Sequence, residues 1–122
     1  MSASILTVDD SASLRMAIRI ALTGAGYDVT EACDGADGLA KAAATRFDLI
    51  VTDLNMPNMD GLSMIRALRE QPAQAGVPII FLSTESDAEV KAQAKAAGAT
   101  GWLVKPFEPE QLIRVVQKVL GR

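Results

Sequence analysis

Residues 47–53 are the stretch that most limits how this chain can fold. Leu49, Ile50 and Val51 form an apolar run with no polar alternation, and Asp53 follows it just before turn-forming residues. An unbroken apolar strand is typical of a sheet that is covered on both faces, as parallel sheets are. Ligands of open parallel sheets bind outside the carboxyl ends of the strands. We therefore predict that Asp53 lies at a ligand-binding edge, although a single aspartate at such a place more often caps a turn.

The same apolar pattern recurs along the chain, and helical periodicity follows each run. The second predicted helix should turn Leu39, Ala42 and Ala43 inward, and the second strand is polar enough to lie near an edge of the sheet. The predicted strands cover residues 5–8, 28–32, 47–53, 78–82 and 101–104, and the predicted helices cover residues 11–24, 36–45, 62–70, 90–97 and 109–120.

This strict alternation with short connections predicts the fold class. Right-handed crossovers between successive strands give a parallel sheet with helices on both faces. We expect an α/β fold of five strand–helix units, a flavodoxin-like, doubly wound, five-stranded parallel sheet in the order 2-1-3-4-5. That order is the usual one for five such units and is not dictated by the residues themselves. No repeat, linker or change in composition divides the chain, so residues 1–122 are expected to form one domain.

Composition excludes several classes of function. The net charge of −3 argues against a nucleic-acid-binding surface. Cys33 is the only cysteine, so the chain can form neither an internal disulfide nor a thiolate metal cluster, which suits a reducing cytoplasm. Neither a secretion signal nor an apolar stretch of membrane-spanning length is present. Histidine is absent, so chemistry must depend on carboxylates, hydroxyls and lysine.

The predicted strand order brings five separated positions to one edge of the sheet. Asp9, Asp10 and Asp53 end neighbouring strands, and Ser83 and Lys105 end the next two. Two carboxylates about 4 Å apart repel by roughly 4 kcal/mol at an effective dielectric constant near 20. Three carboxylates therefore need more counter-charge than one lysine supplies. Because all candidate ligands are oxygen atoms, we predict a Mg²⁺ site, which also suits phosphoryl transfer.

Each of these residues also has an ordinary structural explanation. Asp10 could cap the first helix, Lys105 could be a solvated lysine in a turn, and Trp102 could simply pack in its strand. For the hydroxyl at the end of the fourth strand, Ser83 is favoured over Thr84, which is expected to face solvent. The combination of these residues at one edge favours the functional interpretation of each.

Four motifs, in order and at the ends of the predicted strands, carry a family resemblance. They are Asp9-Asp10, the segment Thr52-Asp53-Leu54-Asn55-Met56-Pro57-Asn58-Met59-Asp60-Gly61, then Ser83-Thr84-Glu85, and finally Lys105-Pro106-Phe107. Together they resemble the signature of two-component response-regulator receiver domains over essentially the whole chain. Within that family the chain most resembles the chemotaxis regulators of the CheY type.

The resemblance implies a role for each matching acid and for the lysine. Asp53 would be the nucleophile that takes a phosphoryl group from a phosphohistidine and forms an acyl phosphate. Asp10, Asp53 and the backbone carbonyl of Asn55 would ligate Mg²⁺, with Asp9 acting through water. Lys105 would pair first with Asp53 and then with a phosphoryl oxygen, and a cis peptide before Pro106 is expected.

The resemblance also implies a switch. The Ser83 hydroxyl would turn toward the phosphoryl group, Trp102 would change rotamer, and Asn55 and Glu85 would tune hydrolysis of the acyl phosphate. The fourth helix, fifth strand and fifth helix would form the output surface, exposing some of Lys91, Lys95 and Trp102. The domain would be a phosphoacceptor with self-catalysed phosphorylation and dephosphorylation, and not an enzyme in the usual sense.

The implied partners are a CheA-like sensor histidine kinase and a flagellar motor switch protein, with no nucleic acid and no membrane. The protein is expected to be a cytoplasmic monomer in chemotaxis, without an output domain because the chain ends just after the fifth helix. The alternative is a phosphate sink or a kinase-feedback receiver.

Three other classes of protein are less well supported. An aspartyl phosphatase of the haloacid-dehalogenase type would need an acid where Asn55 stands. A flavodoxin-type nucleotide binder would have its phosphate repelled by Asp9 and Asp10. An interaction module of the same fold that is never phosphorylated would have no need of a full set of chemical residues.

Overall fold

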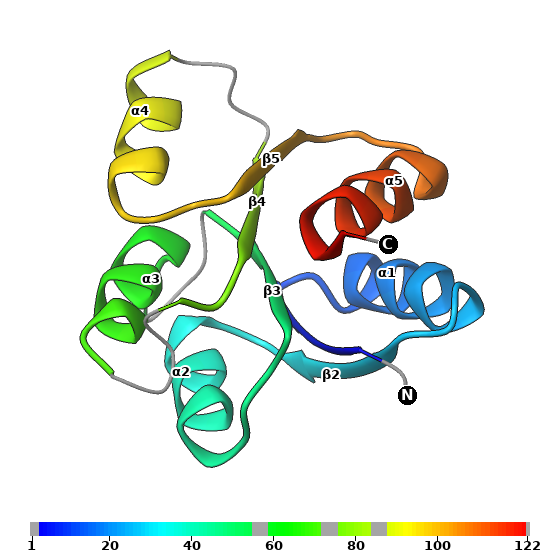
Figure 1. Ribbon diagram of the computed structural model, residues 1–122, viewed down its shortest axis with the longest axis horizontal. Coiled ribbons are helices and arrows are strands. Elements are labelled where there is room, and N and C mark those ends of the chain that lie inside the picture. Colours follow the sequence, from blue (N-terminus) through cyan, green and yellow to red (C-terminus); the bar gives the residue numbers. More distant parts are fainter. Residues whose placement is uncertain (1–2, 55–58, 72–75, 84–87, 122) are drawn as a thin grey trace.

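The computed structural model describes residues 3–54, 59–71, 76–83 and 88–121 and shows five strands alternating with five helices (Figure 1). The chain runs through β1 (Ser4–Val8), α1 (Ala12–Gly24), β2 (Asp28–Ala32), α2 (Gly35–Ala44), β3 (Leu49–Asp53), α3 (Gly61–Arg69), β4 (Ile79–Ser83), α4 (Ala88–Ala96), β5 (Gly101–Val104) and α5 (Pro109–Leu120).

The strands form one parallel sheet in the order β2-β1-β3-β4-β5, which confirms the predicted topology. Every residue of β3 and β4 is buried, as their unbroken apolar runs predict. The β2 strand lies at one edge, and its exposed residues alternate with more buried ones. β3 occupies the centre of the sheet, with β1 on one side and β4 on the other.

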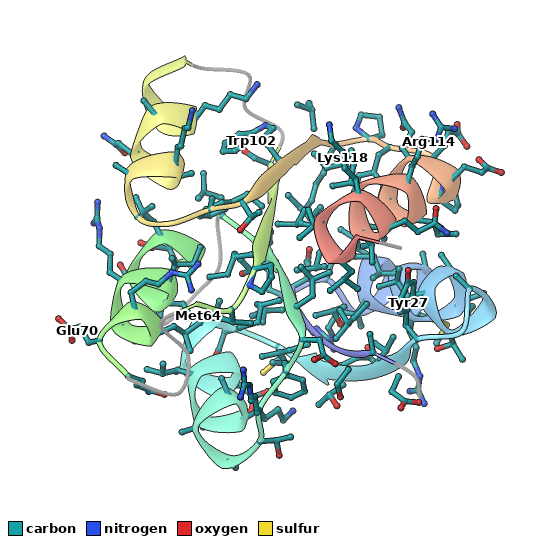
Figure 2. All side chains as sticks on the ribbon, in the orientation of Figure 1. Tyr27, Met64, Glu70, Trp102, Arg114 and Lys118 are labelled. Atoms are coloured by element: carbon teal, nitrogen blue, oxygen red, sulfur yellow. The ribbon has the colours of Figure 1, made fainter. Side chains whose placement is uncertain are left out.

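Helices cover both faces of the sheet, α1 and α5 on one side and α2, α3 and α4 on the other (Figure 1). Alternate residues of β3 belong to two hydrophobic cores, one on each face of the sheet. Leu49 and Val51 pack in the core on the side of α1 and α5, whereas Ile50 packs in the opposite core with Met64 of α3. Figure 2 shows Met64 between α3 and the sheet. None of the helices in the described part of the chain is both long enough and apolar enough to cross a bilayer.

Two sequence expectations about α2 need correction. The helix begins at Gly35, one residue before the predicted start, because the Asp34 side chain caps it by accepting a hydrogen bond from the Asp37 amide at 2.8 Å. Ala43 was expected to face inward but is exposed, because the buried stripe runs through Gly35, Gly38 and Ala42. Helical periodicity alone could not decide which of the adjacent residues Ala42 and Ala43 faces the core.

Gly61 lies unusually close to the end of β3. Its amide donates to the Leu54 carbonyl at 2.9 Å, and a Cβ atom on Gly61 would lie 2.2 Å from the Asp53 carbonyl oxygen. Only a residue without a side chain permits this approach. The start of α3 is thereby packed directly against the backbone of Asp53.

Substituting Gly61→Ala is expected to lower the free energy of unfolding by about 1 to 3 kcal/mol, because the added methyl group must displace backbone and not a flexible side chain. Urea unfolding would measure the change. The matched control is Gly24→Ala, where a Cβ meets nothing within 4 Å at the end of α1. That control should leave stability unchanged or raise it by up to about 1 kcal/mol. Equal effects of both variants would contradict the close approach at Gly61.

Candidate functional site

Three carboxylates meet at the carboxyl edge of the sheet. Asp9 follows β1 and Asp53 ends β3, and these strands are hydrogen-bonded neighbours in which Val8 pairs with Thr52. Asp9, Asp10 and Asp53 each offer one oxygen, and these three oxygens lie within 4.8 Å of one another. Asp9 and Asp53 are only 1% and 7% exposed, whereas Asp10 is exposed to solvent. The cluster is therefore partly buried and open on the Asp10 side.

Lys105 bridges two of these acids. Its Nζ lies 3.2 Å from Asp53 Oδ1 and 3.3 Å from Asp9 Oδ2. The backbone around Lys105 is fixed by a hydrogen bond from its amide to the Ser83 carbonyl at 2.8 Å, and the peptide bond to Pro106 is cis, as expected. The adjacent β4 and β5 strands thus deliver the lysine to the edge where the acids gather.

Backbone amides orient the two buried carboxylates. The Leu54 amide donates to Asp53 Oδ1 and the Ser11 amide donates to Asp9 Oδ1, both at 2.8 Å. Burial is the largest influence on Asp9 and raises the pKa of its carboxyl, against the opposing effects of the Ser11 amide and Lys105. The ionised form of Asp9 therefore carries an energetic cost in the folded protein.

The donor set fits a hard divalent cation. Three carboxylates face one lysine, and every candidate ligand atom in the cluster is oxygen. Oxygen ligands with one open, solvated side suit Mg²⁺, which keeps several of its waters. The shortage of positive charge and the chemistry of the donors thus point to the same kind of ion.

Ser83 and Trp102 lie on the other side of β3 from Asp9 and Asp10. Ser83 ends β4 and is 1% exposed. Trp102 in β5 is paired in register with Phe81, and the centres of their rings lie 5.8 Å apart. The ring is half-buried, and its Nε1 is buried without a hydrogen-bond partner among the described residues. Asn55 and Glu85, also singled out from the sequence, lie outside the described residues.

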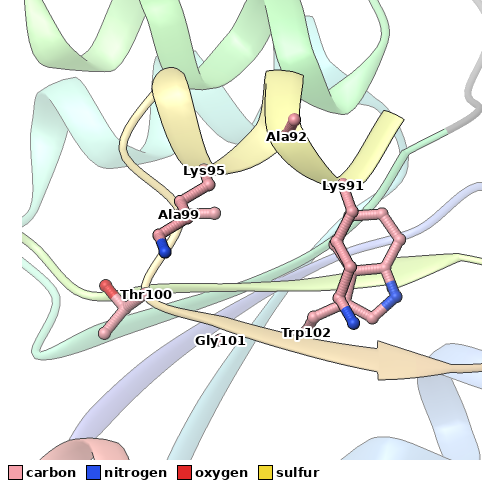
Figure 3. A pocket seen from close by; sticks show the side chains of 7 residues that line it. All are labelled: Lys91, Ala92, Lys95, Ala99, Thr100, Gly101 and Trp102. Carbon is pink, nitrogen blue, oxygen red and sulfur yellow. The ribbon is translucent and has the colours of Figure 1, made fainter. Parts of the chain in front are cut away.

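A cleft of about 470 Å³ opens between α4 and β5 beside Trp102 (Figure 3). Lys91, Lys95 and Ala92 of α4 line one side of it, and Trp102 and Thr100 line the other. The Lys91 Nζ lies 6.0 Å from the centre of the Trp102 ring. The cleft is separate from the acidic cluster and belongs to the predicted output surface.

Sequence reasoning missed one side chain beside the acids. Arg15, in the first turns of α1, donates from one terminal guanidinium nitrogen to the backbone carbonyl of Asp9 at 2.5 Å. An arginine five residues after Asp10 is not part of any of the sequence motifs. Only the path of α1 in three dimensions brings it back to the Asp9–Asp10 loop. Helical periodicity could have placed it near the sheet but could not have identified its acceptor.

The chain matches the family described as the response regulator receiver domain over residues 5–117. It is 36% identical over 118 residues to the transcriptional regulatory protein ResD of Bacillus subtilis. It is 37% identical over 122 residues to the DNA-binding response regulator MtrA of Mycolicibacterium paratuberculosis. These matches cover 97% and 100% of this chain but only 48% and 53% of the relatives, so the chain spans about half their length.

Solved structures extend the comparison. The chemotaxis protein CheY4 of Vibrio cholerae is 48% identical, with a TM-score of 0.94 and coverage of 98% of this chain and 99% of that one. The receiver domain of a sensor histidine kinase from Pseudomonas aeruginosa is 32% identical, with a TM-score of 0.91 and full coverage of both chains. That structure holds a magnesium ion coordinated in its active-site cleft.

Substituting Asp9→Asn is expected to stabilise the protein in EDTA at neutral pH. Because burial raises the pKa of Asp9 above its ordinary 3.8, ionisation of this carboxyl destabilises the folded state as pH rises from that value through the raised pKa. Below 3.8 the carboxyl is protonated in both states and the advantage of asparagine disappears. Thermal melts across this pH range would measure both effects.

Asp28→Asn provides the matched control, since Asp28 is an exposed aspartate at the opposite end of the sheet. It should give no comparable gain at neutral pH. A wild-type protein that melts above Asp9→Asn in EDTA at neutral pH would contradict the assigned penalty.

Proposed function

Because this chain belongs to the response regulator receiver domain family, we propose that Asp53 accepts a phosphoryl group from a phosphohistidine on a sensor histidine kinase. The observation that carries the proposal is the convergence of Asp9, Asp10, Asp53 and Lys105 at one edge of the sheet. Family members act as phosphoacceptors, and here the acceptor would promote its own phosphorylation and dephosphorylation. The site would work in the cytoplasm.

Mg²⁺ is the proposed cofactor. Asp10, Asp53 and the backbone carbonyl of Asn55 would ligate it, and Asp9 would contribute through water. When bound, the ion would supply the positive charge that offsets the carboxylates and the phosphoryl oxygens. The exposed side of the cluster, at Asp10, provides access for both the ion and the donor.

The chain's own residues would carry out the transfer. One Asp53 oxygen attacks the phosphorus while the phosphorus–nitrogen bond of the phosphohistidine breaks, and the bond's electron pair leaves with the imidazole. Asp53 Oδ1 is already held by the Leu54 amide and Lys105, whereas Oδ2 accepts no hydrogen bond from the described residues. This arrangement fixes the carboxylate and leaves one oxygen available. Lys105 and the Ser83 hydroxyl would then bind phosphoryl oxygens.

The switch would act through Ser83 and Trp102. Movement of Ser83 toward the phosphoryl group would alter the end of β4, whose residue Phe81 contacts the Trp102 ring. Trp102 would then change rotamer, and its Nε1, which has no hydrogen-bond partner among the described residues, could gain an acceptor from a partner protein. Asn55 and Glu85 would set the lifetime of the acyl phosphate.

The output surface would consist of α4, β5 and α5. Two clefts on it are lined by cationic side chains, Lys91 and Lys95 from α4 and Arg114 and Lys118 from α5. Figure 2 shows Arg114 and Lys118 projecting from α5. Since the chain as a whole is acidic, with a net charge of −3, this local positive charge favours a partner with acidic side chains.

Chemotaxis is the proposed pathway, with a CheA-like kinase as donor and a flagellar motor switch protein as target. The 48% identity to CheY4 exceeds the 36% and 37% identities to the transcriptional regulators. A phosphate sink or a kinase-feedback receiver is the second candidate, because the same acceptor site would serve it without an output partner. We propose that the domain acts as a monomer in either role.

Tryptophan fluorescence tests the acceptor. Trp102 is the only tryptophan, so beryllofluoride added with Mg²⁺ should quench the fluorescence of the wild type in a Mg²⁺-dependent manner. Asp53→Asn should give no response to beryllofluoride, because it lacks the carboxylate that the phosphoryl analogue must join. Equal responses of the two proteins would rule out Asp53 as the acceptor.

Binding measurements test the output. Calorimetry with the beryllofluoride-loaded protein should detect the motor switch protein of the same organism, and Lys91→Glu should weaken this binding about two- to fivefold, as expected for an exposed ion pair. Arg66→Glu, a charge reversal at an exposed residue of α3, is the control. Binding to the kinase alone would favour the second candidate, and equal losses in both variants would exclude the α4–β5–α5 surface.

A further inference from the structure

Arg15 has no part in the function proposed so far, yet its side chain reaches the loop that carries two of the acids. This side chain is 18% exposed. Among the described residues, it forms no ion pair with the clustered carboxylates. Its guanidinium donates instead to the backbone carbonyl of Asp9 at 2.5 Å, and its Nε lies 3.3 Å from Glu31 Oε1.

The Asp9 carbonyl matters because it belongs to the peptide unit that joins Asp9 to Asp10. A peptide unit is planar, so fixing its carbonyl oxygen also fixes the direction in which the chain enters Asp10. Among the described residues, nothing forms a hydrogen bond or ion pair with the Asp10 carboxylate, and Asp10 is exposed. The position of this ligand therefore depends on the backbone beneath it.

Arg15 is itself anchored to the neighbouring strand. Glu31 lies in β2 and pairs with both Arg15 and Arg19, and its backbone carbonyl accepts a hydrogen bond from Lys41 at 2.5 Å. The guanidinium thus spans from a fixed point on the edge strand to the Asp9–Asp10 peptide. Arg19 shares the Glu31 carboxylate but is 61% exposed, and in the described part of the chain it forms no hydrogen bond or ion pair with the Asp9–Asp10 loop.

We propose that Arg15 is a positioning residue for the divalent cation, holding the Asp9–Asp10 peptide so that the Asp10 carboxylate faces the other two acids. The inference rests on the proposed Mg²⁺ site. The positive charge of Arg15 by itself would weaken Mg²⁺ binding, whereas its proposed positioning role strengthens it. Removing a positive charge beside an acidic site should strengthen cation binding, whereas loss of positioning should weaken it. The two effects have opposite signs, so one measurement separates them.

The test is the Mg²⁺ affinity of the wild type, Arg15→Ala, Arg15→Lys and Arg19→Ala by calorimetry, with thermal melts of each protein in EDTA. Arg15→Ala should raise the dissociation constant about tenfold, as the loss of a group that orients a metal ligand does. Arg15→Lys should recover part of the affinity, because lysine can still donate to the Asp9 carbonyl. Arg19→Ala should change affinity less than about twofold, because this exposed side chain pairs with Glu31 without reaching the Asp9 carbonyl.

Glu31→Gln provides a second variant that keeps the arginine and weakens its anchor, and it should bind Mg²⁺ more weakly than Arg19→Ala does. Unchanged or tighter binding by Arg15→Ala, or equal losses in Arg15→Ala and Arg19→Ala, would overturn the inference. If Arg15→Ala does not fold, unchanged affinity in Glu31→Gln and Arg15→Lys would overturn it equally. A wild-type protein that binds no Mg²⁺ would instead refute the proposed function, and this inference with it.

Discussion

The mutual repulsion of three carboxylates, opposed by one lysine, is the constraint on which the rest of the site depends. Asp9 and Asp53 are buried and Asp10 is exposed, so the repulsion is concentrated in a region that water screens only from one side. The fold tolerates this because two backbone amides and Lys105 hold the buried acids in place. A site that is unfavourable when empty has a strong affinity for positive charge, which is the property that phosphoryl transfer requires.

The sequence predicted the sheet well because a strand that is buried on both faces has an unbroken run of apolar residues. The apolar runs of β3 and β4 and the alternation with helices predicted a parallel sheet, and the strand order was taken from the usual order for five such units. That order then brought Asp9, Asp10, Asp53 and Lys105 together. Strand order is thus enough to assemble residues that are as far apart as Asp9 and Lys105 in the chain. Which residues meet at the ends of the strands can therefore be predicted without knowing the individual side-chain contacts.

Contacts that depend on one side chain reaching one backbone atom could not be predicted. The bond from Arg15 to the Asp9 carbonyl depends on the exact path of α1, and the inward face of α2 was misjudged at Ala43 because adjacent helical positions differ by about 100°. A sequence also could not predict that Trp102 Nε1 is buried without a hydrogen-bond partner in the described part of the chain, because this depends on which acceptors lie around the ring. The roles of Asn55 and Glu85 and the identity of the output partner remain predictions.

The central place of β3 separates two tasks. The acids of the β1 loop lie on one side of Asp53, and Ser83 and Trp102 lie on the other, one and two strands away. The proposed switch would therefore pass from Asp53 to the neighbouring strands β4 and β5. A sheet that ended at β3 would lack Lys105 as well as Ser83 and Trp102, so the two outer strands are needed both to balance the charge of the acids and to connect Asp53 with the α4–β5–α5 surface.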